Sequence, residues 1–200
     1  NPVVLMTNSE IKNFQDILPI LEIAVANKRP LLIMCGIMEG NAITNLLINI
    51  VNKSVECAVI KAPNFGDESI QEMTDISSLI GGTVFDETID LDFSNATFDD
   101  LGQCNKIIVS QIKTTIMVEG NNPTERIKIL RSQLDNAPNT WLKDRIQTRI
   151  GKLAGGVAVI KVGGATEIEM KERTERLDDA LNATKAAIQD GIVVGGGLAL

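Results

Sequence analysis

The 200-residue chain contains no histidine, and only 3% of its residues are aromatic. Its three cysteines, Cys35, Cys57 and Cys104, lie far apart and form no Cys-x-x-Cys pair. A zinc site usually needs clustered cysteines or histidines, so no metal centre is expected. We interpret the thiols as buried, unpaired side chains of a protein that works in a reducing compartment.

Basic charge and long apolar runs are also scarce. The formal net charge is −7, and an acidic chain repels phosphate backbones, so nucleic acid is not an expected partner. No apolar run reaches the roughly 18 residues that span a bilayer, and no signal peptide is recognisable, so no membrane association is expected.

What the chain does have is apolar content for a packed core, since 44% of its residues are hydrophobic. It begins at Asn1-Pro2 without methionine and stops inside an apolar run, residues 195–200. We expect both ends to be cut boundaries of a larger protein.

Short apolar runs alternate with longer periodic segments up to residue 153. Strands are predicted at residues 3–6, 31–34, 55–60, 107–109 and 114–118, the last two as a hairpin. Helices are predicted directly after Glu10, from Leu18 to Arg29 with Pro19 in the first turn, and at 41–52, 69–79, 125–134 and 142–153, the last two as an antiparallel pair. Such alternation is typical of an α/β fold.

The character of the chain changes after residue 153. Glycines at 155–156 and 163–164 flank a predicted apolar strand at residues 157–162. A long charged helix is predicted at 167–189, where Glu169/Arg173 and Glu172/Arg176 have the i,i+4 spacing of ion pairs. Gly191 ends this helix.

Two predicted helices carry more apolar residues than one buried stripe needs. Residues 17–26 are apolar except Glu22, and residues 42–51 carry one stripe through Ala42 and a second through Ile43. In one interpretation both helices are buried on two sides. In the other, the surplus stripes form an exposed groove that binds apolar polypeptide.

Several segments resemble the group I (GroEL-type) chaperonins. They are residues 18–22 (LPILE), 29–33 (RPLLI), 61–67 (KAPNFGD), 81–84 (GGTV), 153–163 (LAGGVAVIKVG), 165–172 (ATEIEMKE), 178–181 (DDAL) and 195–197 (GGG). The resemblance covers essentially the whole chain, in order and with nearly unchanged spacing, which is far more specific than any single motif.

The resemblance implies an apical polypeptide-binding domain at residues 1–157. It also implies the descending part of an intermediate domain at 158–190 and the start of an equatorial ATPase domain at 191–200. The whole protein would be a homo-oligomeric, ATP-driven folding ring that binds non-native polypeptides and a co-chaperonin. Its location would be the bacterial cytoplasm or an organelle, either a mitochondrion or a plastid.

The resemblance also implies roles for individual residues. The polypeptide and the co-chaperonin would bind the same groove, formed by Leu18, Leu21, Ile43, Leu47 and Ile48. Departures from the family pattern put contacts between subunits in doubt but leave the groove intact. They are Ile37 in a loop that is usually acidic, Asn41 and Asn52 where charged residues are common, Asn64 in place of glycine, and Glu68 in a segment that is usually basic.

Asp179 is the one catalytic candidate, and it would act only in the full-length protein. On spacing alone Asp179 is a solvated helix carboxylate, but by resemblance it supports attack of water on the ATP γ-phosphate, and the motif position favours it over Asp178. ATP and Mg would be cofactors of the whole protein, and this fragment is expected to bind neither and to be inactive as an ATPase.

The glycines near the C-terminus admit two interpretations. Gly195, Gly196 and Gly197 form a turn or packing point from sequence alone, whereas by resemblance they lie against the nucleotide. Gly155, Gly156 and Gly191 would be hinges. An alternative hypothesis is a free-standing α/β enzyme that binds a phosphorylated ligand at residues 195–197, although the chain has no histidine and no recognisable nucleophile motif.

Overall fold

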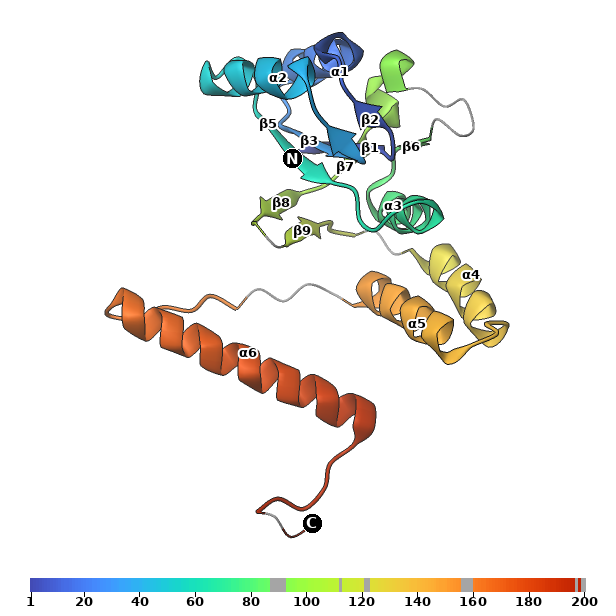
Figure 1. Ribbon diagram of the computed structural model, residues 1–200, viewed down its shortest axis with the longest axis vertical. Coiled ribbons are helices and arrows are strands. Elements are labelled where there is room, and N and C mark those ends of the chain that lie inside the picture. Colours follow the sequence, from blue (N-terminus) through green and yellow to red (C-terminus); the bar gives the residue numbers. More distant parts are fainter. Residues whose placement is uncertain (87–92, 112, 121–122, 156–159, 197, 199–200) are drawn as a thin grey trace. The chain divides into compact units, whose positions relative to one another are not determined.

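The computed structural model of the chain describes residues 1–86, 93–111, 113–120, 123–155, 160–196 and 198 (Figure 1). The chain divides into two compact units, residues 1–156 and residues 157–200. The first unit is mixed α/β, as the alternation of strands and helices predicts. The second unit is built around one long helix.

A sheet of mostly parallel strands forms the centre of the first unit. Its strand order is β5-β3-β1-β6, and β7 pairs antiparallel with β1. The strands are β1 (Val3–Thr7), β3 (Leu31–Cys35), β5 (Cys57–Lys61), β6 (Val84–Phe85) and β7 (Gly102–Gln103). Every residue of β1 and β3 is buried, which explains why both strands are almost continuous apolar runs in the sequence.

Helices cover both faces of this sheet (Figure 1). Helices α1 (Phe14–Ala26) and α2 (Asn41–Val51) pack on the face that carries Val3 and Leu5. Helix α3 (Asp67–Ile80) packs on the opposite face, where Met73 meets Val4 and Met6. The alternation of side chains along β1 therefore feeds two separate apolar clusters.

The first 26 residues contain one helix, so the prediction of two helices is wrong. A short strand, β2 (Glu10–Ile11), pairs with β4 (Ile37–Met38), and α1 then runs without interruption through Pro19. Proline inside a helix costs about 3 kcal/mol. The stripe Ile17, Ile20, Leu21 and Ala24 is buried on both sides of Pro19, and each large side chain in it contributes about 1.5–3 kcal/mol, which outweighs that cost.

Gly36 allows the chain segments of the two short strands to approach each other closely beside the main sheet. A Cβ atom at this position would lie 2.3 Å from the backbone oxygen of Asn8. The Gly36 N–H instead donates to the Ser9 carbonyl at 3.2 Å. This close approach brings β2 and β4, which lead into α1 and α2, together at one edge of the structure.

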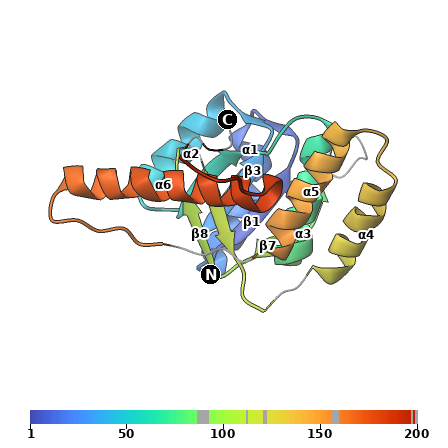
Figure 2. The same ribbon diagram turned by 90° about the horizontal axis from the view of Figure 1, so that it is seen from below.

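The rest of the first unit agrees well with the predicted elements. Strands β8 (Lys106–Val109) and β9 (Thr114–Met117) form the expected antiparallel hairpin. Two 3-10 helices, η2 (Phe93–Asn95) and η3 (Phe98–Asp100), precede it. Helices α4 (Thr124–Asp135) and α5 (Thr140–Ala154) lie side by side (Figures 1 and 2) and enclose a small core of Leu130, Ile146, Ile150 and Leu153.

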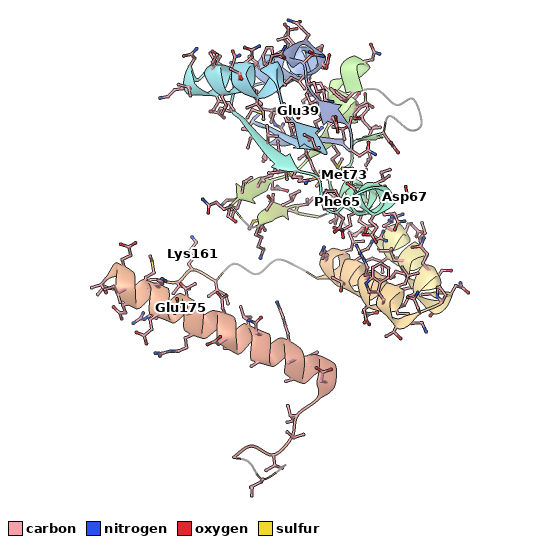
Figure 3. The ribbon with its side chains drawn as sticks, viewed as in Figure 1. Glu39, Phe65, Asp67, Met73, Lys161 and Glu175 are labelled. Carbon is pink, nitrogen blue, oxygen red and sulfur yellow. The ribbon has the colours of Figure 1, made fainter. Side chains whose placement is uncertain are left out.

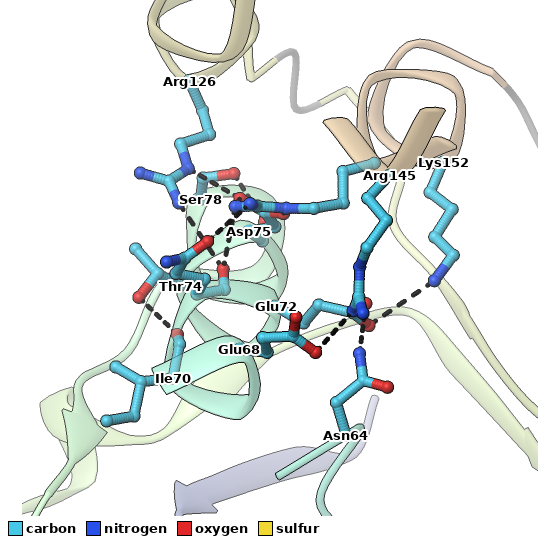
Figure 4. A network of polar contacts seen from close by, with 12 residues as sticks. Asn64, Glu68, Ile70, Glu72, Thr74, Asp75, Ser78, Arg126, Arg145 and Lys152 are labelled. Carbon is cyan, nitrogen blue, oxygen red and sulfur yellow. Dashed lines mark hydrogen bonds and ion pairs between the residues drawn. The ribbon is translucent and has the colours of Figure 1, made fainter. Parts of the chain in front are cut away.

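A buried carboxylate attaches this helix pair to α3 (Figure 4). Asp75 of α3 accepts from Arg126 Nε of α4 at 2.7 Å and from Arg149 Nε of α5 at 2.6 Å. Arg149 Nη1 also donates to Gln71 Oε1 at 2.8 Å. The side chains of Asp75 and Arg149 are both less than one-tenth exposed, so neither charge could be left alone without a large desolvation cost.

We predict that Asp75→Asn lowers the free energy of unfolding by about 3–5 kcal/mol, because it leaves Arg126 and Arg149 without their counter-charge. Urea unfolding followed by circular dichroism measures the change. Glu68→Gln is the control, since Glu68 pairs with Arg145 at 2.7 Å near the surface and should cost less than about 1 kcal/mol. Equal costs for the two substitutions would contradict a structural role for Asp75.

The second unit consists of α6 (Glu167–Asp190) and its flanking segments. Thr166 caps the helix by accepting from the Glu169 N–H at 3.2 Å. Both predicted ion pairs are present, at 2.7 Å for Glu169–Arg173 and 2.6 Å for Glu172–Arg176. The predicted strand at 157–162 lies partly outside the described residues, and its described part, residues 160–162, is not a strand.

Candidate functional site

Helix α2 carries the surplus apolar stripe that the sequence predicts. Its buried side is formed by Ala42 and Leu46. The second stripe, Ile43, Leu47 and Val51, is 39%, 55% and 76% exposed. The interpretation that α2 is buried on two sides is therefore wrong for this chain.

Helix α1 is buried more deeply than its sequence suggests. Leu21 is only 2% exposed and belongs to the core beneath the helix, so it does not lie on the surface where the groove prediction places it. The reason is its phase, because Leu21 is one turn from Ile17 and Ala24, which also face the sheet. Leu18 is half-buried, and Val25 is 48% exposed.

The two helices both connect parallel neighbouring strands, so they point in the same direction. Asn41 Oδ1 at the start of α2 accepts from the Phe14 N–H at the start of α1 at 2.8 Å, which joins the N-terminal ends. Counting on from these two residues at a helical spacing of four, three and four residues gives one stripe on each helix. They are Phe14, Leu18, Leu21 and Val25 on α1, and Asn41, Asn45, Ile48 and Asn52 on α2.

These two stripes differ in the chemistry of their side chains. The α1 stripe is wholly apolar, whereas the α2 stripe is carboxamide except for Ile48, which is 52% exposed. Carboxamides donate and accept hydrogen bonds, as the backbone of a bound polypeptide does. This surface can therefore contact both apolar side chains and main-chain polar groups.

A cavity of about 540 Å³ lies on the opposite side of α2. Ile43 and Leu47 line it together with Ile37 and Met38 of β4 and Val59 of β5. Lys61, whose ammonium lies 4.4 Å from the centre of the Phe65 ring, is at its boundary. The predicted groove residues thus do not form one row, because Ile43 and Leu47 line this cavity whereas Ile48 does not.

We call the exposed apolar side chains on both sides of α2, together with Val25, the helix surface. It consists of Val25, Ile37, Ile43, Leu47, Ile48 and Val51. The groove prediction missed Val25 and Val51, although both continue apolar stripes that are visible in the sequence. Ile37, a departure from the family pattern, adds apolar area next to the cavity rather than removing it.

An acidic cluster lies at the N-terminal end of the helix surface. Lys12 Nζ is 2.7 Å from Glu10 and 3.6 Å from Glu39, the acid between β4 and α2 (Figure 3). The hydrogen bond that Lys12 donates to Glu10, together with the charges of Glu10 and Glu39, raises the pKa of Lys12. Asp16 adds a further acid in the first turn of α1, so this end carries net negative charge.

Asn64 and Gly191 satisfy local backbone demands. Asn64, which replaces a glycine in the family pattern, has φ 55° and donates to Glu72 Oε1 at 2.7 Å. Asparagine is one of the few residues that tolerate this left-handed conformation. Gly191 ends α6 with φ 84°, whereas Gly155 ends α5 in an extended conformation with φ −87°.

The residues predicted to act on nucleotide in the full-length protein lie in the second unit. Asp178 and Asp179 are both exposed on α6. A Cβ atom added at Gly195 or at Gly196 would meet open space within this chain. Gly156 and Gly197 lie outside the described residues.

The described residues contain neither a metal-binding cluster nor a membrane-spanning helix. No group of three or more histidine, cysteine or acidic residues there could hold a metal ion. No helix there has both the length and the apolar character needed to cross a membrane.

The cysteines are poor candidates for nucleophiles. Burial raises the pKa of Cys35 to about 11 and that of Cys57 to about 12, and it also raises the pKa of Cys104. The thiolate is the reactive form, so all three thiols are protonated and inert at neutral pH.

We predict that iodoacetamide alkylates the folded chain at pH 8 at least tenfold more slowly than the urea-unfolded chain. In the unfolded chain the thiol pKa falls back to its ordinary value near 8.5, so thiolate is present at pH 8. Because the folded pKa values are higher, deprotonation favours unfolding, and stability should fall as the pH rises above about 9. Mass spectrometry of alkylated peptides measures the rates, and equal rates would contradict the burial of these thiols.

This architecture is similar to that of known chaperonins. The model of the TCP-1/cpn60 chaperonin family matches residues 11–200. Among solved structures, the chaperonin gp146 from the bacteriophage EL 2 (Pseudomonas aeruginosa), crystallised in the presence of ATP-BeFx, superposes with a TM-score of 0.69 at 20% sequence identity. The match covers 98% of this chain and 40% of gp146, so the chain spans about two-fifths of that relative.

Proposed function

Because the chain belongs to the TCP-1/cpn60 chaperonin family, we propose that it is the part of a chaperonin that captures non-native polypeptides. One observation carries this proposal, namely the exposed apolar side chains of the helix surface. Five of the six residues of the helix surface are between 39% and 55% exposed, and Val51 is 76% exposed. Contiguous apolar surface of this kind on an acidic chain is typical of a binding site.

The physical chemistry of this surface suits promiscuous binding. Burial of a Leu-sized or Ile-sized side chain contributes about 1.5–3 kcal/mol when it is complete, and it has no directional requirement. An unfolded chain exposes such side chains in any order, so a surface that recognises only apolar area accepts many sequences. The net charge of −7 opposes self-association of the chain through the same surface.

The finer assignments are part of the proposal. We assign residues 1–157 to the apical domain, 158–190 to the descending part of the intermediate domain and 191–200 to the start of the equatorial domain. The co-chaperonin would bind the helix surface in competition with the client. The whole protein would be a homo-oligomeric ring that binds ATP and Mg, in the bacterial cytoplasm or in an organelle.

We predict that the 200-residue chain suppresses the aggregation of reduced, denatured lysozyme and that Leu47→Glu removes most of this suppression. A carboxylate at position 47 would have to lose its water when an apolar segment binds. Light scattering at several chain-to-client ratios is the measurement. Ile129→Glu on α4 is the matched control, because Ile129 is similarly exposed but lies outside the helix surface. Equal suppression by wild type and Leu47→Glu would refute the proposed site.

For the full-length protein we propose that Asp179 supports ATP hydrolysis rather than ATP binding. Asp179→Ala should leave ATP affinity within a few-fold and reduce single-turnover hydrolysis by about 10²–10⁴-fold, the usual range for a positioned acid or base. Asp178→Ala, the neighbour on the same exposed helix, controls for loss of helix charge. A similar loss in both variants, or in neither, would exclude a special role for Asp179.

A further inference from the structure

We infer that the helix surface prefers apolar polypeptide segments that end in acidic residues, bound with the acidic end at the C-terminal ends of α1 and α2. The inference rests on the proposed function and specifies which clients the surface favours. It is carried by the distribution of charge along the two helices and by the backbone conformation of two lysines.

The sheet places the C-terminal ends of both helices together. Strands β3 and β5 begin at Leu31 and Cys57, which are direct partners in the parallel register. The Leu31 N–H also donates to the Glu56 carbonyl at 2.9 Å. Because α1 and α2 end at Ala26 and Val51, only residues 27–30 and 52–56 separate them from these paired strand starts.

These two connections carry a basic charge that contrasts with the rest of the chain. They contain Lys28, Arg29 and Lys53 against a single acid, Glu56. Each helix C-terminus contributes about half a negative charge, which reduces this positive charge without cancelling it. The opposite end of the helices is acidic through Glu10, Glu39 and Asp16. The two ends of the helix surface therefore carry opposite charge.

Lys28 and Lys53 occupy backbone positions that favour glycine. Their φ values are 53° and 57°, in the left-handed region. Each follows its helix in the same capping pattern, in which the Lys28 N–H donates to the Val25 carbonyl at 3.0 Å and the Lys53 N–H donates to the Ile50 carbonyl at 3.0 Å. Residues held in unfavourable conformations are often associated with function.

Neither lysine is engaged elsewhere in the described part of the chain. Both side chains are exposed, and no ion pair there involves either of them. Val25 and Val51, the last residues of the helix surface, come three and two residues before them. A segment whose apolar side chains lie on these valines therefore brings its next residues to the lysines, where carboxylates are favoured.

The test compares two fluorescent peptides that share one apolar core and end in either three aspartates or three serines. Fluorescence anisotropy with the 200-residue chain at low ionic strength should show about three- to tenfold tighter binding of the aspartate peptide. The preference should shrink at 0.5 M salt. In Lys28→Gly/Lys53→Gly the two affinities should become equal, while the melting temperature rises because glycine suits both positions.

A matched control separates the local effect from overall charge. Lys106→Gln/Lys143→Gln removes the same charge from exposed positions on β8 and α5 and should keep the preference. Equal binding of the two peptides by wild type, or a preference that survives in Lys28→Gly/Lys53→Gly, would overturn the inference and leave the proposed function standing. Failure to bind either peptide would overturn the proposed function itself.

Discussion

The parallel register of β1, β3 and β5 is the constraint on which the rest of the first unit depends. Parallel neighbours cannot be joined by a tight turn, so each pair requires a crossover, and here the crossovers are α1 and α2. Two successive crossovers on one face of a sheet lie side by side and point the same way. The strand register alone therefore places the N-terminal ends of the two helices together and their C-terminal ends together.

Once the helices are aligned in this way, α2 cannot hide its whole circumference. Ala42 and Leu46 are buried against the core, and Asn41 at the start of α2 contacts the start of α1. The remaining side faces β4 and β5, and β5 is an edge strand of the sheet. The exposed apolar area of this chain is thus a consequence of a helix placed above an edge strand.

The sequence predicted most elements because local signals agreed with the tertiary structure. The hairpin, the helix pair and both ion pairs of α6 depend on short-range spacing, and all are present. Pro19 misled the prediction because tertiary burial of Ile17 and Ile20 outweighs the local preference of proline for a first turn. The short strands β2 and β4 were missed because two-residue strands carry no periodicity.

The candidate site was predicted in composition but not in arrangement. Helical periodicity identified the surplus stripe of α2, yet it gives only the angle between residues and not the direction in which the sheet lies. Leu21 was therefore placed on the surface although it belongs to the core, and Ile43 and Ile48 were placed in one row although only Ile43 lines the cavity. Only the position of the neighbouring strand and helix resolves such assignments.

The buried carboxylate of Asp75 gives the attachment of the α4–α5 pair an unusual dependence on heat. Hydration of charged groups becomes less favourable as temperature rises, so the desolvation cost of a buried ion pair falls, whereas apolar burial gains little further. The ion pairs of Asp75 with Arg126 and Arg149, together with Glu68–Arg145 and Glu72–Lys152, join α3 to the helix pair. Relative to the apolar clusters around the sheet, this junction should therefore weaken least on warming.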